Sequence, residues 1–162
     1  MTDFQAARVT HEYTQTNCAP PSAVFPLLCP VREADWVPGW NYRLIYSQSG
    51  FAEAGCVFIT EENNREITWI VTEYDPVAHR IAFVWVNPGV LATQIQISLE
   101  PAAGNTRAIV RYTYTALSPE GNREVEHYYE TWFKSKMQGW EAAINHYLQT
   151  GTLIDAPPAT NS

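Results

Sequence analysis

His11 is the first residue of the chain whose type and position could support acid–base chemistry. It lies in "RVTHEYTQTN", residues 8–17, two positions before Tyr13. Side chains two positions apart on a strand point to the same face, so His11 and Tyr13 would lie together. If that face borders an apolar cleft, an imidazole beside a phenol could exchange a proton near neutral pH. A hydrogen-bonded or exposed strand histidine is the alternative.

Glu73 offers a second acid or base, with Tyr112 as its partner. A carboxyl group in an apolar pocket has a raised pKa, which allows proton transfer near neutral pH. The residue types are suitable, but the sequence does not show whether their side chains converge. Glu73, like His11, is therefore a candidate whose role depends on the fold.

Metal and cofactor chemistry has little support in the sequence. Glu124 and His127 have the spacing of half a di-iron carboxylate motif. That chemistry needs a second Glu-x-x-His pair and two more glutamates on other helices. The sequence shows no zinc-site histidine spacing, nucleophile elbow, P-loop or dinucleotide fingerprint. We therefore expect neither a metal nor a cofactor.

The cysteines and the N-terminus indicate where the chain resides. Cys18, Cys29 and Cys56 are odd in number and have no C-x-x-C spacing, which favours free thiols in a reducing compartment. The N-terminus, "MTDFQAARVT", lacks the basic and apolar regions of a signal peptide. No window approaches the ~20 apolar residues of a membrane span. We expect a cytoplasmic protein without integral membrane association.

The length and charge limit the domain count and the partners. A chain of 162 residues fits one domain, here 1–162, with an ordered core over about 8–150. The last residues, 155–162 ("DAPPATNS"), have the composition of a flexible tail. A net charge of −7 lacks the basic footprint that nucleic acids require, so we expect no nucleic-acid partner. A homodimer is compatible with these properties.

Alternating polar and apolar residues predict strands through most of the chain. Turn signals such as "ENNR", "DPVAH" and "PAAGN" separate them, and connections this short suit antiparallel hairpins. With the first strand at residues 8–17, the expected sheet has about seven strands. The other candidates are Tyr42–Ser47, Cys56–Glu61, Glu66–Tyr74, Arg80–Val86, Ala92–Leu99 and Arg107–Ala116.

The alternation also predicts inner faces. Ile95 and Ile97 form one inner row, and a second runs from Ala108 to Tyr114 and ends in two tyrosines. For the segment around Trp69 the choice of inner face stays open, because apolar residues occur on both sides.

The apolar period changes from 2 to 3.6 after residue 118. Ser118 supplies a helix cap, Pro119 suits the first turn, and Gly151 is a plausible end. We expect one helix of about 28 residues, roughly 42 Å long. Its apolar stripe must lie along the covered face of the sheet. The stripe contains Val125, Tyr129, Trp132, Phe133, Met137, Trp140, Ile144, Tyr147 and Leu148.

Two segments carry a resemblance to a known superfamily. "APPSAVFPLLCPVREADWVPGW" follows the first strand, and "YTYTALSPEGN" leads into the aromatic helix. The chain resembles the START-like (SRPBCC) superfamily in its polyketide cyclase/dehydrase and lipid-transport branch, over about residues 8–150. The resemblance implies a single START-like domain of the α+β class with a helix-grip fold. In that fold a curved antiparallel sheet wraps around a long C-terminal helix, and two short helices follow the first strand.

The resemblance further implies a cavity between the sheet and the long helix. We expect it to bind a small hydrophobic or aromatic molecule, as in a carrier or sensor. A cyclase- or dehydratase-type enzyme, using His11 or Glu73 with Tyr112, is the alternative, and an interaction domain with a collapsed interior is a third. The candidate ligand-binding residues are Tyr13, Trp69, Tyr112, Tyr114, Tyr129, Trp132 and Phe133.

"WVPGW", residues 36–40, places two indoles on either side of a turn. Pro38 and Gly39 would turn the chain from the second short helix into the next strand. Trp36 and Trp40 would then anchor this corner against the sheet. In the alternative, one of the two indoles lines the mouth of the cavity.

Overall fold

The computed structural model describes residues 3–127 and 129–155, and describes Tyr129 and Glu130 by their backbone only. Of the predicted tail, residues 156–162 lie outside the described part. The elements in chain order are β1 (Arg8–Asn17), α1 (Pro21–Val24), the 3-10 helix η1 (Phe25–Leu28), α2 (Pro30–Glu33), β2 (Tyr42–Tyr46), β3 (Val57–Glu62), β4 (Arg65–Asp75), β5 (Arg80–Asn87), β6 (Leu91–Ala102), β7 (Asn105–Ala116), α3 (Pro119–His127) and α4 (Tyr129–Thr150).

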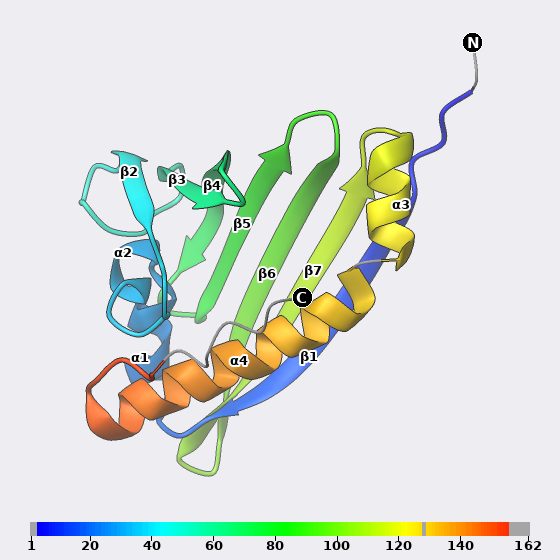
Figure 1. The fold of residues 1–162 in the computed structure, drawn as a ribbon. Coiled ribbons are helices and arrows are strands. Elements are labelled where there is room, and N and C mark those ends of the chain that lie inside the picture. Colours follow the sequence, from blue (N-terminus) through cyan, green and yellow to red (C-terminus); the bar gives the residue numbers. More distant parts are fainter. Residues whose placement is uncertain (1–2, 128, 156–162) are drawn as a thin grey trace.

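The strands form one antiparallel sheet in the order β1-β7-β6-β5-β4-β3-β2. All the links from β2 to β7 join neighbouring strands, as the short turns predict, whereas β1 pairs with β7 at the far edge. Figure 1 shows the sheet curving, with α4 lying across one of its faces. The predicted fold class and strand number are confirmed.

The inner face of the sheet follows the predicted rows. Ile95 and Ile97 are buried, as are the residues from Ala108 to Tyr114 that alternate with polar neighbours. In β4 the open choice is settled, because Trp69 is 8% exposed and Ile70 is 42% exposed. The buried rows face α4 and the short helices, which together cover the apolar core.

The helical segment predicted after residue 118 is present as α3 and α4, which run in different directions on either side of residue 128, a residue outside the described part (Figure 1). The cap and the stop are confirmed: the Gly121 N–H donates to Ser118 Oγ, and Gly151 has a φ of 68°. Gly121 lets α3 pack so closely that a Cβ there would collide with the Val90 carbonyl. The 3.6-residue period continues through both helices, so it carries no information about a change in direction.

Hydrogen bonds attach α4 to β1 along one side of the helix. The Tyr13 hydroxyl donates to Glu141 Oε1 at 2.9 Å, and the Thr16 N–H donates to Glu141 Oε2 at 2.8 Å. One turn further along, Asn145 Oδ1 accepts from the Cys18 N–H at 3.0 Å. These bonds fix the distance between α4 and the β1 edge of the sheet.

Candidate functional site

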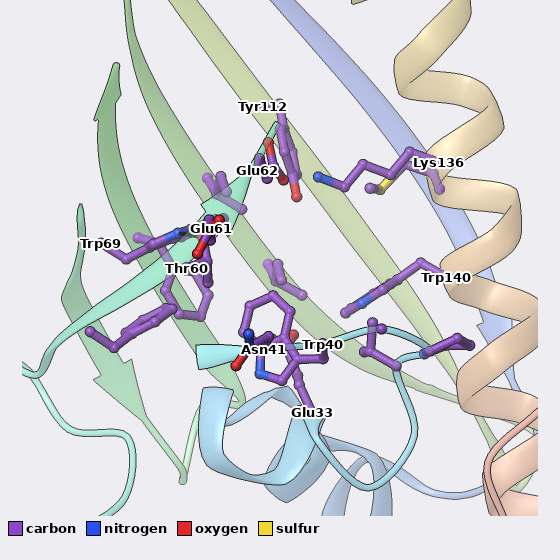
Figure 2. Close-up of a pocket in the computed structure, with 18 residues that line it drawn as sticks. Glu33, Trp40, Asn41, Thr60, Glu61, Glu62, Trp69, Tyr112, Lys136 and Trp140 are labelled. Carbon is purple, nitrogen blue, oxygen red and sulfur yellow. Dashed lines mark hydrogen bonds between the residues drawn. The ribbon is translucent and has the colours of Figure 1, made fainter. Parts of the chain in front are cut away.

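A cavity of about 260 Å³ lies between the inner face of the sheet, α4 and the loop that follows α2. Figure 2 shows the side chains that line it. The aromatic lining comes from the loop, the sheet and the helix, which are distant in sequence. These rings are Trp40, Phe58, Trp69, Phe83, Tyr112 and Trp140.

The sheet side of the cavity is a wall of mutually packed rings. Phe58 and Trp69 stack with centroids 5.4 Å apart, and Phe83 meets Trp69 edge-on at 6.2 Å. The Trp69 Nε1–H donates to Thr60 Oγ1 at 2.8 Å, so its polar atom is satisfied within the wall. A rigid aromatic wall of this kind suits a flat apolar ligand.

The two tryptophans of "WVPGW" have separate roles. Trp36 is fully buried, donates to the Leu27 carbonyl at 2.8 Å and packs on Trp140 at 5.1 Å. Trp40 donates to the Pro30 carbonyl at 2.8 Å and lines the cavity. Trp36 therefore anchors the corner, and Trp40 adds an indole to the cavity wall.

Polar groups gather at one end of the cavity. Lys136 extends from α4 toward Tyr112 on β7, and Glu62 lies nearby on β3 (Figure 2). The Lys136 Nζ is 4.5 Å from the centroid of the Trp132 ring and 5.9 Å from that of Tyr112. Within the described part of the chain, no carboxylate lies within 4.0 Å of this ammonium group.

The environment shifts the titration of three of these groups. Burial raises the pKa of Glu33 to about 8, although the charge of Lys136 acts in the opposite direction. Burial lowers the pKa of Lys136, and the charges of Glu62 and Glu33 oppose this only in part. Burial also raises the pKa of the Tyr112 phenol, helped by the charges of the same two glutamates. Near neutral pH the cavity thus holds a protonated carboxyl group, that of Glu33.

Two of the predicted ligand-binding residues, Trp69 and Tyr112, line this cavity. Tyr114 and Phe133 do not, because they pack in the core at 0% and 4% exposure. Tyr13 bonds to Glu141 across the β1–α4 contact.

Trp132 and Tyr129 complete the predicted set. Trp132 is partly buried beneath the Lys136 ammonium and is not among the residues that line the cavity. The side chain of Tyr129 lies outside the described part of the structure.

Neither predicted acid or base lines the cavity. His11 stacks on Phe133, with ring centroids 5.4 Å apart, and its Nε2 has no partner among the described residues. Glu73 pairs with Arg80 at 3.2 Å and is 45% exposed. A register shift between Val71 and Glu73 reverses the alternation of β4, so Glu73 turns away from the inner face.

Lys136 and Glu33 were missed by sequence reasoning. For Lys136 a signal was present: it lies four residues from both Trp132 and Trp140, so a cation sits between two indoles on one helical face. Glu33 gave no such signal, because a four-residue helix shows no period. A charged residue within an aromatic helical stripe is therefore worth considering as a site residue.

A second hollow, of about 550 Å³, opens between the β3–β4 turn and α3. Its lining includes Arg65, Arg123, Glu124 and His127. Among residues 3–127 and 129–155, no group of three or more His, Cys, Asp or Glu side chains could hold a metal. Because charged side chains dominate this lining, we take the smaller aromatic cavity as the candidate site.

No family model matches the chain, and no curated protein has a matching sequence. Solved structures do match. Norcoclaurine synthase from Thalictrum flavum superposes with a TM-score of 0.68 at 13% identity, over 90% of this chain and 88% of that one. Zhui aromatase/cyclase from Streptomyces sp. R1128 gives 0.63 at 13% identity, over 93% and 100%. Ara h 8.0201 gives 0.67 at 17% identity, over 89% and 99%.

The chain therefore has the helix-grip fold of these solved structures. The predicted resemblance is confirmed at the level of fold, and identities of 13–17% carry no statement about activity. No helix in the described ranges is both long enough and apolar enough to cross a membrane.

Proposed function

We propose that this START-like chain binds a small aromatic or hydrophobic molecule with one polar group in the cavity beneath α4. One observation carries the proposal: a ring-lined cavity has Lys136 and Tyr112 at one end, and Glu33 also lines it. Its volume of about 260 Å³ suits a ligand of one or two rings, since pockets that hold drug-sized ligands measure about 300–1,000 Å³. The rings would hold the apolar body, and the polar end would orient it.

Blocking the cavity tests this proposal. Val37 lines it, and Val37→Trp would place an indole where the ligand body lies. Val77→Trp is the matched control, because Val77 is 90% exposed in the β4–β5 turn. In titrations with 2-naphthol followed by calorimetry, the control should bind like the wild-type protein and the blocked variant at least about tenfold more weakly. Equal binding by all three would contradict the proposal.

Acid–base catalysis on the bound molecule is a second candidate, in line with a cyclase- or dehydratase-type enzyme. Glu33 as the acid and Lys136 as the base favour it, because burial raises the pKa of Glu33 to about 8 and lowers the pKa of Lys136. Solved structures with this fold include an enzyme named norcoclaurine synthase and one named aromatase/cyclase.

Deuterium exchange at the methyl group of acetophenone, followed by NMR, separates this candidate from simple binding. Catalysis requires faster exchange with the wild-type protein than with Glu33→Gln or Lys136→Met. Exchange at the buffer rate with all three proteins would leave binding as the function and remove the catalytic candidate.

A further inference from the structure

Lys136 differs in its surroundings from the other lysine of this chain. The sequence contains two lysines, Lys134 and Lys136, both on α4. Lys134 is exposed, whereas Lys136 is half-buried and lines the cavity. Residues two positions apart on a helix point in widely different directions, so the chain contains its own control for lysine chemistry.

Burial of Lys136 disfavours its ammonium form, although the faces of the Trp132 and Tyr112 rings attract a cation. Its Nζ faces the rings of Trp132 and Tyr112, and no carboxylate of the described residues pairs with it. Burial in the aromatic lining lowers its pKa. A neutral amine in an apolar pocket is a nucleophile toward carbonyl carbon.

The charge of the lining argues against an anionic ligand as the partner of Lys136. Glu33, Glu61 and Glu62 all line the cavity, and Lys136 is its one cationic residue among those described. A carboxylate ligand would be repelled by the charges of Glu61 and Glu62 in this lining. A neutral carbonyl compound would not, and its flat aromatic body would lie against the ring wall that includes Trp40 and Trp69.

We propose that Lys136 forms a reversible imine with a small aromatic aldehyde or ketone held in this cavity. The inference rests on the proposed function, that the cavity binds a small aromatic molecule. The Nζ attacks the carbonyl carbon to form a carbinolamine, and the C–O bond then breaks as the C=N bond forms. The nitrogen gives up its two protons, and the oxygen leaves with both of them as water.

Glu33 supplies the proton transfer that this step needs. Its carboxyl group lines the same cavity and is protonated near neutral pH, since its pKa is about 8. It can donate a proton to the departing hydroxyl group and recover one from the nitrogen. No oxidant, reductant or metal enters the balance.

Reductive trapping tests the inference. The wild-type protein is incubated with benzaldehyde, reduced with cyanoborohydride and mapped by peptide mass spectrometry. Lys136 should carry the benzyl group at least severalfold in excess over Lys134, because the cavity holds the aldehyde beside its Nζ. Lys136→Met should abolish this adduct and Lys134→Met should retain it. Equal labelling of the two lysines, or preference for Lys134, would overturn the inference.

Benzyl alcohol separates this inference from the function on which it rests, because it has the same ring but cannot form an imine. If benzyl alcohol binds in the cavity and benzaldehyde leaves no adduct on Lys136, the imine is refuted and ligand binding stands. If neither compound binds or labels the protein, both are refuted for one-ring ligands. Because labelling is compared between two lysines of one wild-type chain, a variant that fails to fold does not affect the result.

Discussion

The space between the sheet and α4 is filled on one side and hollow on the other. Beside β1 and β7, His11, Tyr114 and Phe133 form a packed cluster with ring centroids 5.4–6.0 Å from His11. Beside β3 to β6, rings of the same kinds surround a cavity of about 260 Å³. Tyr112 lies at the boundary, since it touches Phe133 at 5.2 Å and also lines the cavity.

The difference arises from what sets the height of α4 above the sheet. On the β1 side, Glu141 and Asn145 bond directly to the strand, so the helix lies close and the rings fill the gap. On the other side, α4 meets Trp36 through Trp140, and Trp36 is anchored on η1. The contact between Trp36 and Trp140 thus holds α4 away from strands β3 to β6. The apolar side chains between α4 and these strands do not fill the space that remains.

Removing one ring from each side should give the largest contrast. Phe133→Ala should destabilise the protein by about 3–5 kcal/mol, because a closely packed ring leaves a new void. Phe83→Ala should cost about 2–3 kcal/mol, because its ring already borders empty space and loses fewer contacts. Chemical denaturation of both variants measures the difference. Equal losses would mean that the cavity is closed in solution.

The buried carboxyl group of Glu33 should make the free energy of unfolding depend on pH. The folded-state pKa of Glu33, about 8, lies above its ordinary value of 4.5. The stability that this group contributes is complete below pH 4.5 and is lost as the pH rises through 8. The titratable groups coupled to it are Lys136 on α4 and Tyr112 on β7.

Glu33→Gln should therefore remove a pH-dependent loss of stability. Between pH 4.5 and 8 the wild-type protein should lose roughly 1–2 kcal/mol relative to the variant, below the full linkage value because the carboxyl group is only half-buried. Lys136 titrates in both proteins, so its own contribution largely cancels in the comparison. Denaturation midpoints measured across this range provide the test. Parallel curves would show that water reaches Glu33 freely.

The same contrast explains what the sequence could predict. Strands and turns were predictable, because alternation and turn residues are local signals. Tyr112 follows from its inward row, whereas the inner face around Trp69 stayed open because apolar residues occur on both sides of that strand. The change of direction between α3 and α4 was not predictable, because a change in the direction of the helix axis does not alter the apolar period. The prediction for Glu73 was wrong because β4 contains a one-residue irregularity, and no pattern in the sequence indicates that irregularity. Which inward ring meets a void depends on the height of α4, a property of the whole fold.

The smallest expected effect concerns two neighbouring tyrosines of β7 on opposite sides of the boundary. Tyr112→Phe should leave the fold intact and weaken binding of 2-naphthol by about 0.5–1.5 kcal/mol, up to about tenfold in affinity. Tyr114 is fully buried away from the cavity, so Tyr114→Phe should alter stability and leave the affinity unchanged. Calorimetric titration of both variants, with circular dichroism to check the fold, measures this. If Tyr112→Phe binds like the wild-type protein, its hydroxyl does not meet the ligand, and Lys136 and Glu33 alone orient it. If instead Tyr114→Phe weakens binding, the boundary is misplaced and the ligand reaches into the packed cluster.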